Sequence, residues 1–310
     1  MYKYFFKRLL MIIPILLGVA LVIFFILQLT PGDPGTMILE AGGDQTAIDR
    51  LNEELGYNRP VLERFFSYLY NVVFKLDFGS SYRTRLPVID NIRGRIPVSI
   101  TLAFSTILFA SVIGIPIGVL SAVKQYSLLD TVPTVISLFM AALPGFWLGM
   151  MMMYFFSLKL GWLPSNGVGS WQHFILPVVS LGLPYAAQEL RFTRSSMLET
   201  IRQDYVRTAR AKGANERLVI WKHALKNALL PVITVTGGNF GVLLGGAVVT
   251  ESLFNIPGLG SLIITSIKIK DVPTVMGATL ILAFIFSLIL LGVDLLYAAV
   301  DPRIKAKYSK

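Results

Sequence analysis

The sequence predicts an all-α membrane protein with six membrane-spanning helices. Of its 310 residues, 54% are hydrophobic and 15% are charged, whereas a soluble domain carries roughly 25% charged residues. The mean hydropathy is +0.66. A span needs about 20 mostly apolar residues. The apolar runs of that length cover about 9–29, 98–123, 131–157, 174–197, 229–250 and 274–300.

The first apolar run is predicted to remain as a transmembrane helix. Basic residues precede it, which is also the layout of a signal peptide. The run is longer than the apolar core of a signal peptide, and Gln28 is its only strongly polar residue. The sequence Thr-Pro-Gly-Asp-Pro that follows it offers no small-x-small cleavage site. We therefore expect residues 1–30 to form a cytoplasmic N-terminus and the first transmembrane helix.

The next segment differs in composition from the spans. Residues 31–95 are rich in charged residues, with Asn, Gly and Pro among them. Within this segment, Arg59–Phe74 places apolar side chains at helical spacing, which predicts an amphipathic helix. We expect 31–95 to be an extracytoplasmic insertion, 96–300 to hold the other five spans, and 301–310 to be a cytoplasmic tail.

The placement of basic residues predicts the orientation. Short cytoplasmic loops carry an excess of Lys and Arg. With six spans and the N-terminus inside, the inside segments hold a large excess of basic residues, and the outside segments are nearly balanced. Both termini are therefore expected in the cytoplasm. We interpret the net charge of +10 as an orientation signal beside the lipid bilayer, and no nucleic acid partner is expected.

The residue types argue against several kinds of catalytic site. The chain has no cysteine and two histidines, which excludes thiolate chemistry and argues against a histidine-built metal centre. It has no Gly-x-x-x-x-Gly-Lys-Ser/Thr phosphate loop, no Gly-x-Ser-x-Gly and no His-Glu-x-x-His. We expect no catalytic residue, no metal site and no cofactor on this chain.

The longest predicted cytoplasmic loop, about 199–230, has the composition of a docking element. Gly213 is suited to end one helix and Asn215 to cap the next, so two short helices are expected. Small side chains alternate here with cations, which allows a partner to approach closely and to pair its carboxylates. The composition also fits a basic loop at lipid headgroups, where each Lys or Arg gains about 1 kcal/mol.

Several stretches of the chain carry a family resemblance. The loop holds Asp204–Gly213 (Asp-Tyr-Val-Arg-Thr-Ala-Arg-Ala-Lys-Gly) and His223–Pro231. These stretches resemble the coupling loop of ABC-importer permeases, in particular the B-type permease of the dipeptide, oligopeptide and nickel importers. The Glu-Ala-Ala positions read Arg207-Thr208-Ala209, a departure that is usual in the peptide branch. The resemblance covers nearly the whole chain and includes Pro31–Pro34, Asp77–Ser81 and Pro257–Gly260.

The resemblance implies a type I ABC-importer permease fold and a set of partners. A C-type permease would complete the pore, and an extracytoplasmic binding protein would deliver substrate, meeting the insertion. Two ATP-binding subunits would hold ATP and Mg. The chain would lie in a bacterial or archaeal plasma membrane and pass di- or oligopeptides or, alternatively, a nickel chelate, glutathione or a sugar. The residues that would couple to the ATPase are Arg207, Thr208, Ala209, Arg210, Ala211, Lys212, Gly213, Ala214 and Asn215.

Glycines and acids in the last two spans are candidates for the pore or its gate. Glycine recurs every fourth residue in the fifth span and builds a smooth face, which fits a pore or subunit interface and also plain packing. An acid within a membrane is by default a functional candidate, and an acid at a helix end is the alternative. The candidates are Gly237, Gly241, Gly245, Glu251, Phe254 and Asp294.

Two further features have plainer interpretations. Glu189 is expected to pair with Arg191 or Arg194 at the inner interface. Trp162 and Trp171 are typical of an aromatic belt at the outer interface. A passive channel and an intramembrane enzyme are the remaining classes of function. A passive channel would leave the basic loop without a role. An intramembrane enzyme would need a catalytic motif, and the sequence has none of the motifs named above.

Overall fold

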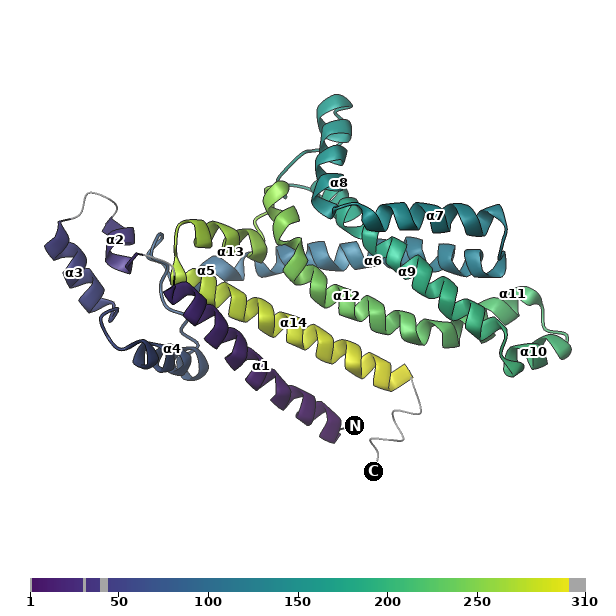
Figure 1. Ribbon diagram of the computed structural model, residues 1–310, viewed down its shortest axis with the longest axis horizontal. Coiled ribbons are helices and arrows are strands. Elements are labelled where there is room, and N and C mark those ends of the chain that lie inside the picture. The colour runs from purple at the N-terminus through teal and green to yellow at the C-terminus, as the bar shows by residue number, and fades with distance from the viewer. Residues whose placement is uncertain (1, 30–31, 40–43, 301–310) are drawn as a thin grey trace. The chain divides into compact units, whose positions relative to one another are not determined.

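The computed structural model describes residues 2–29, 32–39 and 44–300. Regular structure in these residues is helical, apart from one isolated bridge between Ser80 and Pro87 (Figure 1). The predicted tail 301–310 lies outside the described residues. The helices are α1 (Tyr2–Gln28), α2 (Pro34–Leu39), α3 (Gln45–Glu54), α4 (Val61–Lys75), α5 (Val88–Arg93), α6 (Ile96–Val123), α7 (Leu128–Ala142), α8 (Gly145–Met152), α9 (Ile175–Ile201), α10 (Asp204–Ala211), α11 (Glu216–Leu218), α12 (Leu225–Leu253), α13 (Leu259–Lys268) and α14 (Val272–Val300).

The described residues also hold three short helices of other types. A π-helix, Met153–Lys159, follows α8, and a second, Val219–Ala224, joins α11 to α12. A 3-10 helix, Trp171–Phe174, leads into α9. The chain forms two compact units. The first is built on Ile100–Ile256 with the chain segments near both ends, and the second is built from Lys7–Ser99 and Pro257–Ser287.

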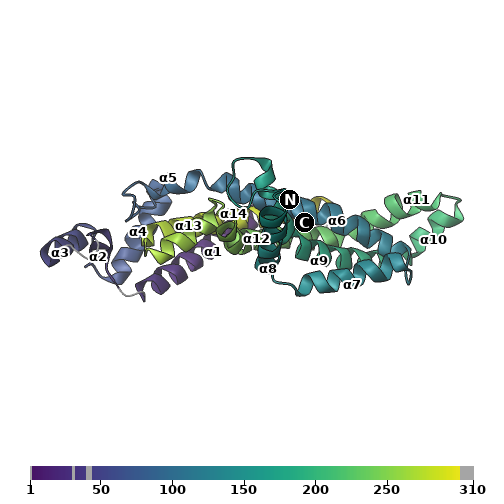
Figure 2. The ribbon, with the colours of Figure 1, turned by 90° about the horizontal axis from the view of Figure 1, so that it is seen from above.

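The central helix of the first unit is α9. Its side chains are buried along most of its length, and it lies against α7, α8 and α12 (Figures 1 and 2). Glycines of α6 let the two backbones approach, because a Cβ added at Gly118 would lie 2.7 Å from the carbonyl oxygen of Leu190. Since protein covers α9, it does not need an apolar surface for lipid. It is accordingly less apolar than α1, α6, α12 and α14.

The predicted all-α membrane fold is confirmed. Four helical stretches in the described residues are long and apolar enough to cross a membrane. They are Phe5–Gln28, Val88–Val123, Glu216–Gly245 and Val272–Leu295. A fifth is counted if α7 and the helical stretch that follows it form one span. At 27 residues α9 is long enough to be a span. Its polar side chains lower its mean hydropathy, so it is not among these apolar stretches. The count of six spans therefore stays a prediction.

The predicted span 131–157 is broken in the middle. The helical stretches Leu128–Ala142 and Gly145–Lys159 meet at an angle of 100°. Pro144 lies at the break, and a proline disfavours the helical conformation of the residue before it. Leu143 is accordingly extended, with φ −84° and ψ 132°. A continuous apolar run therefore forms two helices here.

The second unit has two hydrophobic clusters. One joins α1, α4 and α14, and the other joins α5, α13 and α14. Phe78 contacts both clusters. The buried members of the first cluster are Ala20, Phe24, Phe65, Met276 and Leu280. Those of the second are Val88, Ile92, Leu259, Leu262 and Ala278.

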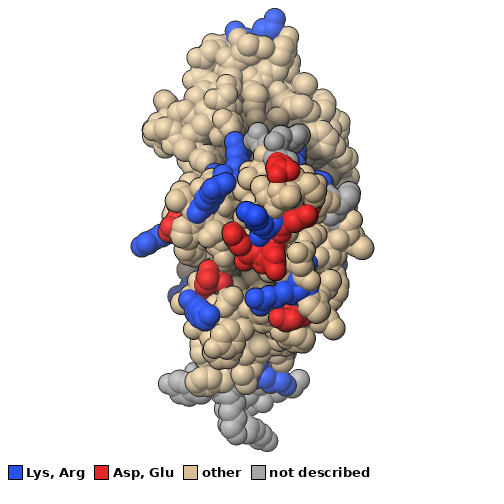
Figure 3. All heavy atoms as spheres, turned by 90° about the vertical axis from the view of Figure 1, so that its left-hand side faces the viewer, with Lys and Arg blue, Asp and Glu red and all other residues tan. Residues whose placement is uncertain are grey.

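Buried hydrogen bonds connect the insertion to the start of α14. The Asp271 carboxylate accepts from Ser81 Oγ (2.5 Å), from the Tyr82 backbone N–H (3.0 Å) and from Thr274 Oγ1 (2.7 Å). These bonds hold a segment of the insertion against a membrane-spanning helix. The exposed face of this unit near α2–α4 carries basic and acidic side chains intermixed (Figure 3), as the nearly balanced charge of 31–95 predicts.

Candidate functional site

The predicted docking loop forms a short helix between two turns. α10 ends at Ala211, and Gly213 follows with φ +78°, the left-handed conformation predicted for it. The Asn215 side chain accepts a hydrogen bond from the Arg217 backbone N–H at 2.9 Å, which confirms the predicted cap. The second predicted helix is not separate, because the chain stays helical from Glu216 to Gly245.

α10 is anchored in the hydrophobic core of the first unit. Val206 is fully buried, and it belongs to a cluster that draws residues from α6, α9, α10, α12 and the π-helix before α12. Tyr205 adds a polar link, since its hydroxyl accepts a hydrogen bond from Asn227 Nδ2 at 2.9 Å. The buried members of this cluster, here called the anchor cluster, are Val119, Ala122, Met197, Val206, Val219, Ile220, Ala224, Leu225 and Ala228.

The nine predicted coupling residues divide into an outer and an inner set. Ala209 and Ala214 are half-buried and pack against the anchor cluster. Arg210 is also half-buried. The exposed residues are Arg207, Thr208, Ala211, Lys212, Gly213 and Asn215. The outer set presents two cations and small side chains on a helix that the inner set holds in place.

An ion pair closes the turn after α10. Arg210 Nη2 donates to Glu216 Oε1 at 2.7 Å, and Arg210 Nε donates to Glu216 Oε2 at 3.0 Å. The Arg210 hydrogen bonds lower the pKa of the Glu216 carboxyl. This two-point contact fixes the approach from α10 to α11. The contact between Arg207 and Asp204, at 3.9 Å with both side chains largely exposed, adds little.

The predicted pore glycines do not share one environment. A Cβ added at Gly237 would lie 2.2 Å from Val293 Cγ1 of α14, so Gly237 serves close packing within the unit. Gly241 is buried. Gly245 is exposed, and a Cβ there would meet no atom within 4 Å. The glycine face of α12 therefore packs against α14 at Gly237 and is exposed at Gly245.

The gate candidates at the end of α12 are buried. Glu251 and Phe254 are each 1% exposed. The Phe254 carbonyl oxygen accepts from the Gly167 backbone N–H at 3.0 Å, and its ring packs beside Gly149 of α8. Asp294 is half-buried in α14.

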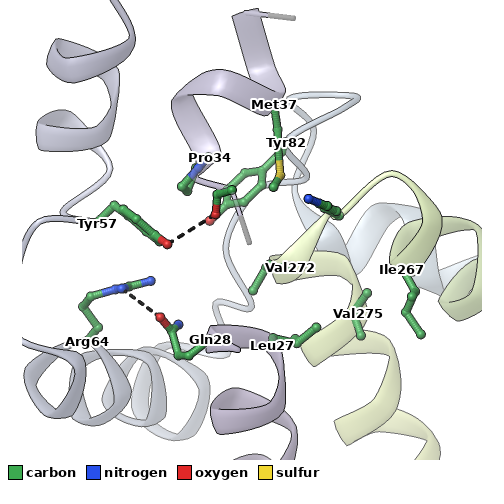
Figure 4. A pocket seen from close by; sticks show the side chains of 12 residues that line it. Leu27, Gln28, Pro34, Met37, Tyr57, Arg64, Tyr82, Ile267, Val272 and Val275 are labelled. Atoms are coloured by element: carbon green, nitrogen blue, oxygen red, sulfur yellow. Dashed lines mark hydrogen bonds between the residues drawn. The ribbon is translucent and has the colours of Figure 1, made fainter. Parts of the chain in front are cut away.

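The expected partner of Glu189 is wrong. Arg194 binds Asp130 instead, at 2.5 Å and 2.8 Å. Glu189 is fully buried, and its Oε1 accepts from Thr236 Oγ1 at 3.0 Å. Sequence reasoning missed the Asp130 pair because its partners are 64 residues apart. A small cavity with both apolar and polar lining residues also lies in the second unit at the end of α1 (Figure 4).

Several hydrogen-bonding groups line part of that cavity. Arg64 Nη1 donates to Gln28 Oε1 at 3.2 Å, and the Arg64 guanidinium lies 4.2 Å from the centre of the Tyr57 ring. The Tyr57 hydroxyl donates to the Gly32 carbonyl at 3.4 Å. Burial raises the pKa of Tyr82 to about 12, so this phenol stays neutral. The described residues include no cluster of three or more acidic, histidine or cysteine side chains placed to hold a metal.

Comparison with known proteins assigns the family. The family of binding-protein-dependent transport system inner membrane components matches residues 114–306, and the model of its N-terminal region matches residues 1–103. The chain belongs to that family. It is therefore an inner-membrane permease component of an ABC importer, a class without an ATPase site of its own. This confirms the resemblance found in the sequence.

Individual relatives agree with the family. The chain is 40% identical over 307 residues to the glutathione transport system permease protein GsiC of Escherichia coli K12 and 41% identical to that of Salmonella typhi. Each comparison covers 99% of this chain and 100% of the relative.

Solved structures share the fold. An inward-facing MetNI methionine ABC transporter chain matches with a TM-score of 0.57 at 21% identity, over 69% of this chain and 97% of that one. A chain of an amino acid ABC transporter matches with a TM-score of 0.51 at 15% identity, over 69% and 94%. At these identities the likeness concerns the fold.

Proposed function

We propose that the chain forms half of the pore of an importer for small peptides, and that ATPase subunits drive it by docking on α10. The full-length match to glutathione permeases supports the substrate class, because glutathione is a tripeptide. The other half of the pore would be a C-type permease. Two ATP-binding subunits would carry ATP and Mg, and an extracytoplasmic binding protein would supply the peptide.

The observation that carries the coupling role is the burial of Val206 in the anchor cluster. A helix held only by its flanking loops would move without disturbing the spans. Here a displacement of α10 acts on α6, α9 and α12, because all three contribute to the same cluster. Packed cores shift between discrete arrangements rather than deforming continuously. Closure of the ATPase pair would thus change access to the pore.

The proposal requires an orientation and a set of contact residues. The α10 side faces the cytoplasm, so both termini lie there as well, and α9 serves as the sixth span. The exposed cations Arg207 and Lys212 and the small residues Thr208 and Ala211 meet the ATPase. Nucleotide binding changes the conformational equilibrium of the pore only to the extent that nucleotide binds one conformation of the complex more tightly than the other.

The test is transport by the complete complex in vesicles. We expect ATP-dependent uptake of glutathione or of di- and tripeptides, dependent on the binding protein. Uptake of a nickel chelate or a sugar, with none of any peptide, would contradict the substrate class. Solute flux without ATP would indicate a channel. Peptide hydrolysis by the purified chain would indicate an enzyme.

A further inference from the structure

α4 carries apolar side chains on two of its three sides. With 3.6 residues per turn, Phe65, Tyr68 and Leu69 share the side that packs against α1 and α14. Polar residues share another side, among them Arg64, Ser67 and Asn71, and Glu63 of the first turn lies at the border of the next side. Between these two sides runs a strip of large apolar side chains, here called the apolar strip. Its members are Leu62, Phe66, Tyr70, Val73 and Phe74.

The apolar strip is open. Each of its five side chains is more than half exposed, from 56% for Tyr70 to 73% for Phe74. Exposed apolar residues that occur singly are normal, but a contiguous patch of this kind marks a surface that another phase or molecule covers. The strip therefore requires an occupant.

The packing of α4 on α1 shows which way the strip faces. α4 runs across α1 rather than alongside it (Figures 1 and 2). Arg64 bonds to Gln28, the last residue of α1, whereas the Phe65 ring lies 5.2 Å from the Phe24 ring, one turn further into the span. Around the circumference of α4, Arg64, Phe65 and the apolar strip follow one another in that order. The strip thus faces back along α1, and the polar side faces beyond its end.

The bilayer lies in the direction that the strip faces. α1 is an apolar span, and residues of its second half, among them Leu21, Val22 and Phe25, are exposed. The strip adjoins this exposed surface, because the Phe65 ring centre lies 6.3 Å from that of Phe25 and 5.7 Å from that of Phe66. Lys75, at the end of α4, lies over the Tyr70 ring at 5.5 Å, and aromatic and basic residues of this kind are typical of helices at the membrane interface.

We propose that α4 is an interfacial helix, with its apolar strip in the lipid leaflet at the Gln28 end of α1. Its apolar side would lie about 5–10 Å into the boundary between headgroups and acyl chains, and its polar side in water. The insertion is then fixed to the membrane surface by α4 as well as to α14 by Asp271. This holds for any substrate of the importer.

The absence of cysteine in the 310-residue sequence allows a direct test. Nitroxide labels are attached to Phe66→Cys and Val73→Cys variants in the full complex, assembled with cysteine-free partner subunits in vesicles. We expect oxygen, which concentrates in lipid, to relax these labels severalfold more than a water-soluble nickel chelate does. Ser67→Cys is the matched control on the same helix, and its label should respond more to the nickel chelate.

Three results would overturn the proposal. Labels at positions 66 and 73 that respond like the label at 67 would place the strip in water. Labels reached by neither reagent would mean that the second permease subunit covers the strip. Nickel accessibility that is lost only when the binding protein is added would make the strip a protein-docking surface. ATPase activity of each labelled complex shows that it is assembled.

Discussion

Arg194 of α9 holds the carboxylate of Asp130 at the start of α7 with two hydrogen bonds, Nε at 2.5 Å and Nη2 at 2.8 Å. Ser121 Oγ of α6 donates to the same carboxylate at 2.5 Å. The Asp130 side chain is 5% exposed and that of Arg194 is 26% exposed. One carboxylate therefore ties together three helices of the first unit.

Removing this carboxylate is expected to destabilise the first unit strongly. Asp130→Ala leaves the half-buried Arg194 charge without its partner, and the cost should approach but not exceed the value of about 3–5 kcal/mol for fully buried pairs. The measurement is the thermal unfolding midpoint of the purified complex. Adding Arg194→Ala should recover part of the loss, because the unpaired charge is then gone.

Asp204→Ala is the matched control for this pair. Asp204 also lies near an arginine, but the contact is 3.9 Å long and both side chains are largely exposed. Exposed pairs contribute little, so no shift in the unfolding midpoint is expected. A similar shift for Asp130→Ala and Asp204→Ala would contradict the role of the buried pair.

Asp130 and Glu189 show where sequence reasoning stops. Both are acids near membrane-spanning segments. The sequence suggested only nearby arginines as partners of Glu189, and it suggested no partner for Asp130. Asp130 binds an arginine 64 residues away, and Glu189 binds a threonine 47 residues away. Such pairs depend on which helices are neighbours, and no local periodicity encodes that. The composition of each helix was predictable, whereas its partners were not.

The second prediction concerns the turn after α10. Gly213 has φ +78°, and a Cβ added there meets no atom within 4 Å, so only the backbone conformation resists substitution. The left-handed conformation costs most residues about 1–2 kcal/mol, and asparagine tolerates it better. Gly213→Val should lower ATP-driven uptake while membrane insertion is kept, and Gly213→Asn should stay close to the native protein.

Vesicle uptake and ATP hydrolysis, measured side by side, check this prediction. Lower uptake at a normal hydrolysis rate is the expected result for Gly213→Val, because the turn positions α10 and does not touch nucleotide. Equal uptake by the valine and asparagine variants would mean that the turn conformation does not matter for coupling.

The third prediction separates anchoring from docking. Val206→Asp would place a carboxylate in the anchor cluster, where an unpaired ion costs several kcal/mol, so α10 should detach. Hydrogen exchange of residues 204–211 should then accelerate, and uptake should be lost. Thr208→Asp, two residues on and exposed, should slow uptake by repelling the ATPase without changing that exchange. Accelerated exchange in both variants, or in neither, would refute the division into inner and outer sets.

The fourth prediction is a pH dependence of the same loop. Arg210 lowers the pKa of Glu216 below its ordinary value of 4.5. The stabilisation is therefore complete above that ordinary value and is lost as the pH falls through the lowered value. Because both side chains are partly exposed, the pair contributes at most about 1 kcal/mol.

Hydrogen exchange at Gly213–Arg217, corrected for its intrinsic pH dependence, measures this effect. Glu216→Gln should exchange faster than the native chain at neutral pH and at the same rate once Glu216 is protonated. A constant difference between the two proteins at every pH would show that the charge of Glu216 is not the cause.

Local features of the fold were the most predictable from sequence. Gly213 and Asn215 mark the end of one helix and the start of the next, and both take those positions because their conformational and hydrogen-bonding preferences are local. α9 is the opposite case. Its burial lets it carry polar side chains, so it is less apolar than the other spans and a search for apolar helices does not select it. Pro144 was visible in the sequence, but the 100° bend depends on how α7 and α8 pack.

The fifth prediction tests the glycine face of α12. An alanine methyl at Gly237 would lie 2.2 Å from Val293 Cγ1, so α14 must shift or Val293 must change rotamer. Overpacking of this kind costs about 1–3 kcal/mol. Gly237→Ala should lower the unfolding midpoint of the complex, and Val293→Ala in the same chain should restore much of it by returning the space.

Gly238→Ala is the neighbouring control, because a Cβ there meets no atom within 4 Å and alanine favours a helix over glycine. Its unfolding midpoint should match or exceed that of the native chain. A Cβ added at Gly245 likewise meets no atom within 4 Å. If Gly245→Ala weakens binding of the second permease while Gly238→Ala does not, the open end of the glycine face is a subunit contact. If neither variant changes assembly, the face serves packing at Gly237 alone.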